Sequence, residues 1–152
     1  MRLTLLDYRS YLLLDPFLTN RILAEKISQV TKDTKVENNM KINDVGIIPK
    51  RGNILKFDFE FTTEYKKDVG NLKINGNLLY SDNEKKIKET LDSWRKSKKL
   101  DKEIMTSITN FILIKCNVKA LMLSEQVNLP PHIRLPMLEI ESKKATKGDY
   151  IG

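Results

Sequence analysis

Apolar and polar residues alternate in two segments of this chain, residues 55–61 and 71–80. Because the side chains of a β-strand point to opposite faces in turn, a period of two predicts half-buried antiparallel strands. The positions on their apolar faces are Leu55, Phe57, Phe59, Phe61, Leu72, Ile74, Leu78 and Tyr80. Gly76 lies in phase with them, which predicts a bulge, a bend or a large side chain that packs over the strand.

Two further features complete a predicted β-meander. Residues 40–48, MKINDVGII, are typical of a short strand, and the following PKRGN is typical of a turn. The sequence KKDVGN supplies a second turn between the two alternating segments. Together they predict successive antiparallel strands, and a fourth strand is available from residues 20–38.

The segment 11–30 admits two interpretations. Asp15 before Pro16 is typical of a helix start, since aspartate caps helices well and proline suits the first helical position. The residues that then fall near one helical face are Leu18, Ile22, Leu23, Ile27 and Val30. This pattern favours a helix. The competing interpretation is a strand from about residue 21 to residue 32.

After residue 81 the period changes from two to about 3.6, which predicts two helices. Ser81 and Glu84 have the spacing of a capping box, and Asp101 can cap a second helix that extends to residue 126. The first helix has a narrow apolar stripe formed by Ile87, Leu91 and Trp94. The second has an apolar side formed by Ile104, Ile108, Phe111, Ile112, Cys116, Lys119 and Met122. Because its apolar band is wide, we expect it to cover the sheet and also to contact another surface, such as another subunit.

Residues 129–138, here called the strap, begin with LPPHIRLP. Proline ends helical structure and pushes the residue before it into an extended conformation, so the strap must be extended. We expect its apolar residues to lie back on the body of the protein or on a neighbouring subunit. These residues are Leu129, Ile133, Leu135 and Leu138.

The order of the elements, strands first and helices after, predicts an α+β fold in which a twisted antiparallel meander packs against two C-terminal helices. We expect one domain over residues 1–141. Within it the pattern does not decide the structure of residues 1–35. The polar tail, residues 142–152, is expected to be flexible.

Composition narrows the class of protein. The chain has 152 residues, of which 40% are hydrophobic and 31% charged, as in a globular domain. Cys116 is the only cysteine, which excludes an intramolecular disulfide and fits a reducing, cytoplasmic location. The apolar N-terminus carries Asp7, Arg9 and Asp15 and has no small-residue cleavage pattern, so we expect no signal peptide. We also expect no membrane insertion, because the apolar runs are too short to span a bilayer.

Residues capable of chemistry are few. His132 has no cysteine or carboxylate at metal-ligand spacing and no obvious nucleophile, so we interpret it as a partly exposed residue of the strap. Cys116 is interpreted as a small core hydrophobe. Asp58 and Glu60 lie on the wet face of a strand, where a solubilising role is the simpler explanation. No glycine-rich phosphate loop is present. We therefore expect no enzyme activity, no metal and no cofactor.

Basic residues cluster on the first predicted helix and the segment after it. The net charge of the chain is +7, although its lysine-, isoleucine- and asparagine-rich composition also explains this as a general bias. The basic patch consists of Lys85, Lys86, Lys88, Arg95, Lys96, Lys98, Lys99 and Lys102. With Trp94 and Tyr80 nearby, the basic patch would suit RNA binding by charge and stacking. The plainer interpretation is a solvated helix face with Trp94 in the core.

The aromatic segment KFDFEF also has two interpretations. Its phenylalanines either form the core beneath the helices or line a groove for extended, unfolded polypeptide. The candidate groove residues, chosen for their apolar character, are Phe57, Phe59, Phe61, Trp94 and Met122.

Two long stretches resemble the SecB-like export chaperones, and within them an archaeal SecB-like group. The stretch GNLKINGNLLYSDNEKKI resembles the last strand of that family and its passage into the helices. The stretch MTSITNFILIKCNVKALMLSEQVNLPPHIRLPMLEI resembles the long helix of the family and its closing segment of leucines and prolines. The resemblance covers roughly residues 40–140.

The resemblance implies a non-enzymatic, ATP-independent holdase chaperone. It also implies a homodimer or homotetramer built through the long helix and the sheet edges, with a groove for non-native polypeptide or a protein partner. Bacterial SecB proteins are strongly acidic for docking to the motor SecA, whereas this chain is basic. An export or targeting role therefore does not carry over simply. The alternative function is a basic RNA- or ribosome-associated module.

Overall fold

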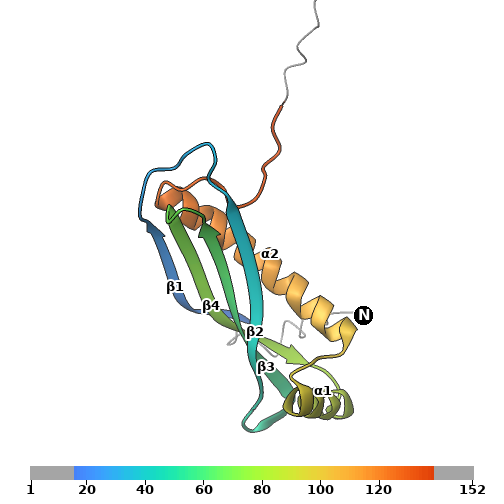
Figure 1. Ribbon diagram of the computed structural model, residues 1–152. Helices are drawn as coiled ribbons and strands as arrows, with labels where there is room; N and C mark the ends of the chain where they lie inside the picture. Colours follow the sequence, from blue (N-terminus) through green and yellow to red (C-terminus); the bar gives the residue numbers. More distant parts are fainter. Residues whose placement is uncertain (1–15, 139–152) are drawn as a thin grey trace, which may run out of the picture.

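A computed structural model describes residues 16–138, which form a four-stranded antiparallel sheet and two helices. The elements are β1 (Phe17–Lys26), β2 (Val36–Ile48), β3 (Arg51–Tyr65), β4 (Gly70–Ser81), α1 (Glu84–Ser97) and α2 (Lys102–Gln126). Figure 1 shows α2 lying across one face of the sheet, with α1 at the end where the β2–β3 hairpin turns. The predicted α+β fold is confirmed. Residues 1–15 and the tail at 142–152 lie outside the described part of the chain.

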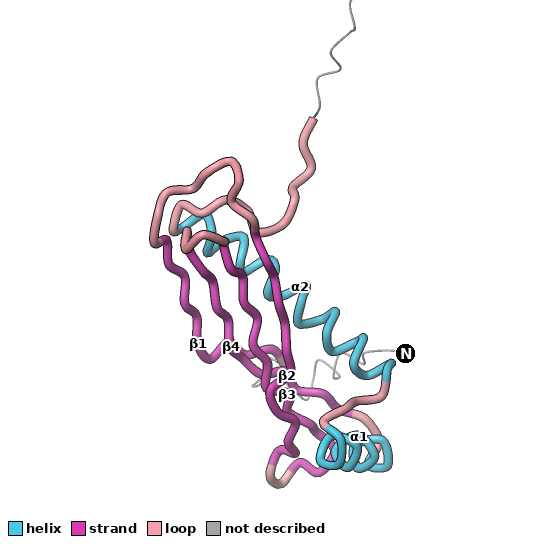
Figure 2. Tube along the Cα trace, in the orientation of Figure 1, coloured by secondary structure: helices cyan, strands magenta, loops and turns pink. Residues whose placement is uncertain are grey.

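The strands follow the order β1-β4-β3-β2 across the sheet. The successive strands β2, β3 and β4 form the predicted meander, and β1 joins the free side of β4. Figure 2 shows the four strands side by side along most of their length. The two edges of the sheet are therefore β1 and β2.

The favoured helix for the N-terminal segment is wrong, since residues 17–26 form a strand. β1 pairs with β4 from Phe17 opposite Leu78 to Lys26 opposite Gly70. The apolar residues of β1 recur at spacings that suit a helix as well as a strand, so the local pattern does not separate the two. Pairing with β4 satisfies the backbone groups along one side of that strand, and this tertiary gain overrides the weak local preference.

Gly76 explains how the strands fit together at the middle of β4. A Cβ there would clash with the Leu18 carbonyl oxygen and would lie 2.8 Å from the ring of Phe59. The β1–β4 register also shifts at this level, between Thr19 and Arg21. Of the alternatives predicted for Gly76, a large side chain over the strand is confirmed, whereas the extra residue of the bulge lies opposite it, in β1.

The core lies between the sheet and α2. The buried positions of α2 are Ile104, Ile108, Ile112, Cys116, Ala120 and Ser124. A step of four residues advances about 40° around a helix, so the buried line rotates gradually as α2 crosses the twisted sheet. The predicted apolar side is therefore correct for its first turns and wrong at its end, where Met122 is 58% exposed.

The helix starts are set by side-chain caps. Asn83, and not the predicted Ser81, caps α1, because its side-chain oxygen accepts a hydrogen bond of 2.9 Å from the Lys86 amide. Ser81 instead ends β4. The predicted cap of α2 is confirmed, since the Asp101 side chain accepts a hydrogen bond of 3.2 Å from the Glu103 amide.

The predicted apolar stripe of α1 is also confirmed, because Ile87, Leu91 and Trp94 are buried. The indole Nε1 of Trp94 donates a hydrogen bond of 3.2 Å to Asp44 Oδ1. This bond lowers the pKa of the Asp44 carboxyl, since it stabilises the ionised form. Trp94 thereby ties α1 to the end of β2.

Candidate functional site

The strap crosses the sheet on its helix-covered side. The side chain of Leu129 packs against Gly70 at the start of β4. The hydroxyl of Tyr65, at the end of β3, donates to the Pro130 carbonyl oxygen at 2.5 Å. On β2, Asn38 Nδ2 donates to the His132 carbonyl oxygen at 3.1 Å. The strap therefore passes over β4, β3 and β2 in that order, as the orange-red segment after α2 shows in Figure 1.

His132 is buried, and the expectation that it is partly exposed is wrong. Only 4% of the residue is exposed, and its Nε2 lies 2.9 Å from Asn117 Oδ1 on α2. Its ring meets Phe61 edge-on, with centroids 6.1 Å apart. Because the Asn117 oxygen accepts, Nε2 carries the proton, and the buried Nδ1 has no hydrogen-bond partner among residues 16–138. His132 thus joins the strap to α2 and β3.

The environment of His132 disfavours its charged form. Burial lowers the pKa of His132 below its usual 6.5, because the imidazolium loses hydration inside the protein. A neutral imidazole is held in place near neutral pH. We therefore interpret His132 as an anchor of the strap.

The remainder of the strap is exposed. Of the residues expected to lie back on the body, only Leu129 does so. Ile133 is 37% exposed, Leu135 50% and Leu138 101%. These three residues therefore do not lie on the body of the protein within the described chain, and their contact with a neighbouring subunit stays a prediction. Beyond β2 the strap exposes apolar side chains.

A second exposed apolar surface lies on the outer side of α2. We call Ile114, Val118 and Met122 the outer line; they are spaced by four residues and are 66%, 57% and 58% exposed. Only 28% of the most apolar 18-residue window of α2 is buried. By length and composition α2 is also long enough to cross a membrane, contrary to the expectation from the sequence, but core helices of soluble proteins pass the same test. An apolar face of this kind marks a contact surface.

The two edges of the sheet differ in character. β1 exposes apolar side chains on both faces, among them Leu18, Ile22 and Leu23 at 40%, 46% and 39%. β2 exposes charged and amide side chains, and its register with β3 shifts between Ile42 and Asp44. Both edge strands have a register shift, so the difference between them lies in their side chains, and charged side chains protect an edge from pairing with another chain. β1 is therefore the more open edge.

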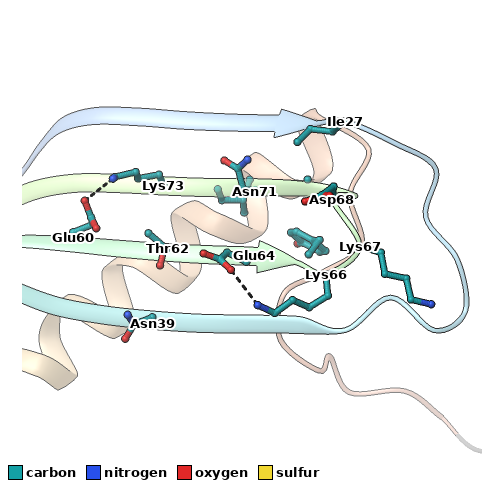
Figure 3. Close-up of a pocket in the computed structure, with 13 residues that line it drawn as sticks. Ile27, Asn39, Glu60, Thr62, Glu64, Lys66, Lys67, Asp68, Asn71 and Lys73 are labelled. Atoms are coloured by element: carbon teal, nitrogen blue, oxygen red, sulfur yellow. Dashed lines mark hydrogen bonds and ion pairs between the residues drawn. The ribbon is translucent and has the colours of Figure 1, made fainter.

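The outer face of the sheet is polar. An open hollow of about 620 Å³ lies there, lined by residues of β2, β3, β4 and the β3–β4 turn and by Ile27 after β1. Figure 3 shows the side chains that line it. Glu60 stands at one end of it, 2.7 Å from Lys73 Nζ and 3.1 Å from Lys41 Nζ. Hydrogen bonds from Lys73 and then Asn75 are the main reasons that the pKa of Glu60 falls to about 2. A carboxylate held ionised in this way is a poor general acid or base near neutral pH.

The predicted groove residues separate into two groups. Phe57, Phe59, Phe61 and Trp94 are buried in the core, whereas Met122 is exposed on the outer line. The buried aromatic side chains can reach a client only where a covering element moves aside. Their role in peptide binding stays a prediction.

The sequence pattern did not mark Ile114 and Val118 of the outer line, and it placed Leu18, Ile22 and Leu23 of β1 on one face of a helix. The relevant signal was the i, i+4 spacing of apolar residues along α2. That spacing gives a line of residues but does not say which side of an apolar helix faces the sheet.

The basic patch lies on the exposed side of α1 and on the turn into α2. Lys85 and Lys86 make only long ion pairs, 4.0 Å to Glu89 and 3.9 Å to Asp101. The two aromatic residues that would supply stacking, Trp94 and Tyr80, are each 7% exposed. The basic patch therefore offers charge without an accessible ring.

Cys116 is the remaining candidate nucleophile. Burial raises the pKa of the Cys116 thiol to about 12, so the thiolate is absent near neutral pH. Within residues 16–138, no group of three or more His, Cys, Asp or Glu side chains could hold a metal ion.

Comparisons with known proteins address the fold. No protein-family model and no curated protein matches the chain. Among solved structures, it is similar to the Mycobacterium tuberculosis Rv1957 SecB-like chaperone in complex with a ChAD peptide from the Rv1956 HigA1 antitoxin. The TM-score is 0.51, the identity is 14%, and the match covers 82% of this chain and 88% of the other.

The fold is SecB-like. At 14% identity the likeness shows the arrangement of the sheet and helices, and it transfers no site residue. The finer resemblance to an archaeal SecB-like group stays a prediction.

Proposed function

We propose that this protein binds non-native polypeptide or a protein partner without ATP, as a holdase chaperone. One observation carries the proposal: a SecB-like fold leaves an extensive apolar surface uncovered along α2. The similar M. tuberculosis protein is a chaperone whose structure holds a peptide. Large exposed apolar patches on a folded domain mark sites of protein interaction.

The mechanism that these surfaces support is burial of an apolar segment of the client. Each aliphatic side chain that moves from water into such a contact contributes about 1.5–3 kcal/mol. Pairing of the client main chain with an open strand edge adds affinity without sequence preference. β1 is suited to this because its apolar side chains flank an edge that no other strand within residues 16–138 pairs with.

The outer line and β1 also suit self-association. We propose a homodimer or homotetramer in which copies meet through these surfaces, so that α2 is covered on both sides. A cytoplasmic location is part of the same proposal, because the lone cysteine suits a reducing compartment. A link to protein targeting or transport is also proposed on the resemblance alone.

The proposal includes no catalysis. Glu60 is held ionised, the Cys116 thiol is held protonated, and His132 is buried and neutral. Each of the three pKa shifts moves its group away from neutral pH, which makes the group less suited to proton transfer there.

Aggregation of a chemically denatured client tests the proposal. We expect suppression at near-equimolar ratios, unchanged by ATP. A protein of similar size and basic charge, such as lysozyme, controls for nonspecific effects of charge. Absence of suppression at a tenfold excess of this protein would sink the chaperone proposal.

RNA binding is the second candidate, favoured by the exposed basic patch. If the basic patch binds RNA, affinity falls steeply with salt, and replacement of Lys96, Lys98 and Lys99 by glutamate abolishes that dependence. Because Trp94 and Tyr80 are buried, we expect weak affinity that high salt removes. Tight binding that persists at 0.3 M salt would favour this candidate over the chaperone.

A further inference from the structure

The surface beneath the strap has the features of a peptide-binding site. Tyr65 and Asn38 donate to two main-chain carbonyl oxygens of the strap, those of Pro130 and His132. Donors of this kind recognise an extended backbone whatever side chains it carries. Pro130 and Pro131 have no N–H group of their own, so carbonyl recognition leaves no donor unsatisfied at these positions.

One of these donors is positioned before any peptide arrives. Thr63 Oγ1 donates a hydrogen bond of 2.8 Å to Asn38 Oδ1. With its oxygen held by Thr63, the Asn38 amide points its nitrogen toward the strap. Thr63 is fully buried, so this orientation belongs to the sheet and does not depend on the strap.

Side-chain recognition comes from two buried positions three residues apart. Leu129 is 5% exposed and fills the space that Gly70 leaves by having no Cβ. His132 places its ring between Phe61 and Asn117. The surface therefore selects an aliphatic side chain followed, three positions later, by a flat ring, and it tolerates proline between them.

The strap is held by few contacts. No strand ladder of the described chain includes it. Its hydrogen bonds there are one of 2.8 Å from the Leu129 amide to the Ser124 carbonyl oxygen at the end of α2, the two bonds to its own carbonyl oxygens and the His132–Asn117 bond. Only Leu129 and His132 are buried. The buried Nδ1 of His132 has no partner, which weakens the hold. Segments held in this way open locally without unfolding the domain.

We propose that residues 129–132 occupy, within their own chain, a surface that binds an extended segment of a client, and that the strap must leave before the client binds. This inference rests on the proposed function. A tethered segment competes at an effective concentration on the order of millimolar, so a short free peptide is excluded. A long unfolded client with additional contacts on α2 displaces the strap.

Loosening the strap alone tests the proposal, because it leaves the receiving surface intact. Leu129→Ala removes the buried side chain, and Leu135→Ala is a matched control on the exposed part of the same segment. The probe is fluorescein-labelled, reduced and carboxymethylated lactalbumin, which stays unfolded. Affinity depends on the fraction of molecules with the strap released. We expect the Leu129→Ala chain to bind the probe about tenfold more tightly than wild type, and the Leu135→Ala chain to match wild type.

A second variant tests whether the client binds the same surface as the strap. Tyr65→Phe in the Leu129→Ala background removes a donor that the client would use. We expect the double variant to bind the probe about three- to tenfold more weakly than Leu129→Ala alone. Tyr80→Phe in the same background is the matched control, since the Tyr80 hydroxyl bonds Asp82 and not the strap. Equal effects of the two tyrosine substitutions would overturn the claim that the client and the strap bind the same surface.

Hydrogen exchange gives a measurement that needs no variant. Addition of unlabelled, unfolded lactalbumin to the wild-type chain should accelerate exchange across residues 127–135. If wild type binds the probe while exchange there is unchanged and Leu129→Ala has no effect, the strap is structural and only this inference fails. If neither wild type nor the loosened chain binds the probe, the proposed chaperone function fails with it.

Discussion

Acidification should weaken this fold through His132, and the effect can be isolated. The pKa of His132 lies below its usual 6.5 in the folded protein, so the unfolded chain takes up this proton first as the pH falls. The stability that neutral, buried His132 contributes is therefore fully present above pH 6.5. It is lost progressively as the pH falls below 6.5 toward the folded value.

The size of the loss has an upper limit. One proton contributes at most 1.36 kcal/mol per pH unit, so between pH 6.5 and pH 5.0 the free energy of unfolding falls by up to about 2 kcal/mol. That is a substantial part of the stability of about 5–15 kcal/mol typical of a domain. With a urea slope of about 1–3 kcal/mol per molar, this loss lowers the unfolding midpoint by up to about 2 M at the smallest slope and about 0.7 M at the largest.

The assay is urea unfolding at pH 7.5 and pH 5.0, followed by fluorescence or circular dichroism, on wild type and His132→Ala. The variant should be less stable at pH 7.5 by about 2–3 kcal/mol, because it loses the bond to Asn117 and the contact with Phe61. It should also lose most of the pH dependence.

The two carboxylates whose pKa values are lowered in the folded protein do not affect the comparison of wild type with His132→Ala. The pKa values of Glu60 and Asp44 are lowered in the folded protein, so their contributions are present above their ordinary values of 4.5 and 3.8 and are lost chiefly below them. Both chains carry these groups, so comparison cancels them. An identical pH dependence of unfolding in wild type and His132→Ala would refute the claim that His132 is buried and neutral in the folded protein.

Three further predictions test separate parts of the structure. Gly76→Ala should destabilise the fold by about 1–3 kcal/mol, because the added Cβ meets Phe59 and the β1 backbone. Gly46→Ala is the control and should change stability by less than about 0.5 kcal/mol, because nothing lies within 4 Å of that Cβ. Thermal unfolding of the two variants measures the difference. Cys116, whose burial raises its pKa to about 12, should resist a thiol reagent at pH 8 until the protein unfolds, and rapid labelling of the folded protein would contradict this. Ile114→Glu should dissociate the proposed oligomer while Lys115→Glu leaves it intact, as light scattering would show; an equal molecular mass for both variants would count against the outer line as the interface.

The parts of the fold that the sequence predicted are those whose pattern is local. β3 and β4 each bury one face, so their period of two appears directly in the sequence. β1 has no such pattern, because it lies at an edge and exposes apolar side chains on both faces. Its identity as a strand depends on pairing with β4, which lies some fifty residues away and leaves no local signal.

The candidate site was harder to predict for the same reason. His132 has partners from elsewhere in the chain: Asn117 on α2 and Phe61 on β3. Neither spacing belongs to a known short motif, so the sequence left the histidine without a role. Along α2, apolar residues occur on most sides, and only the twist of the sheet decides which of them are buried.

Binding of unfolded polypeptide tests the central claim most directly. The full-length protein would be titrated against labelled lactalbumin in its reduced, carboxymethylated form and in its native form, with and without ATP. We expect saturable binding of the unfolded form, no binding of the native form and no effect of ATP. Absence of binding to the unfolded form at a tenfold excess of this protein, or equal binding of both forms, would contradict it.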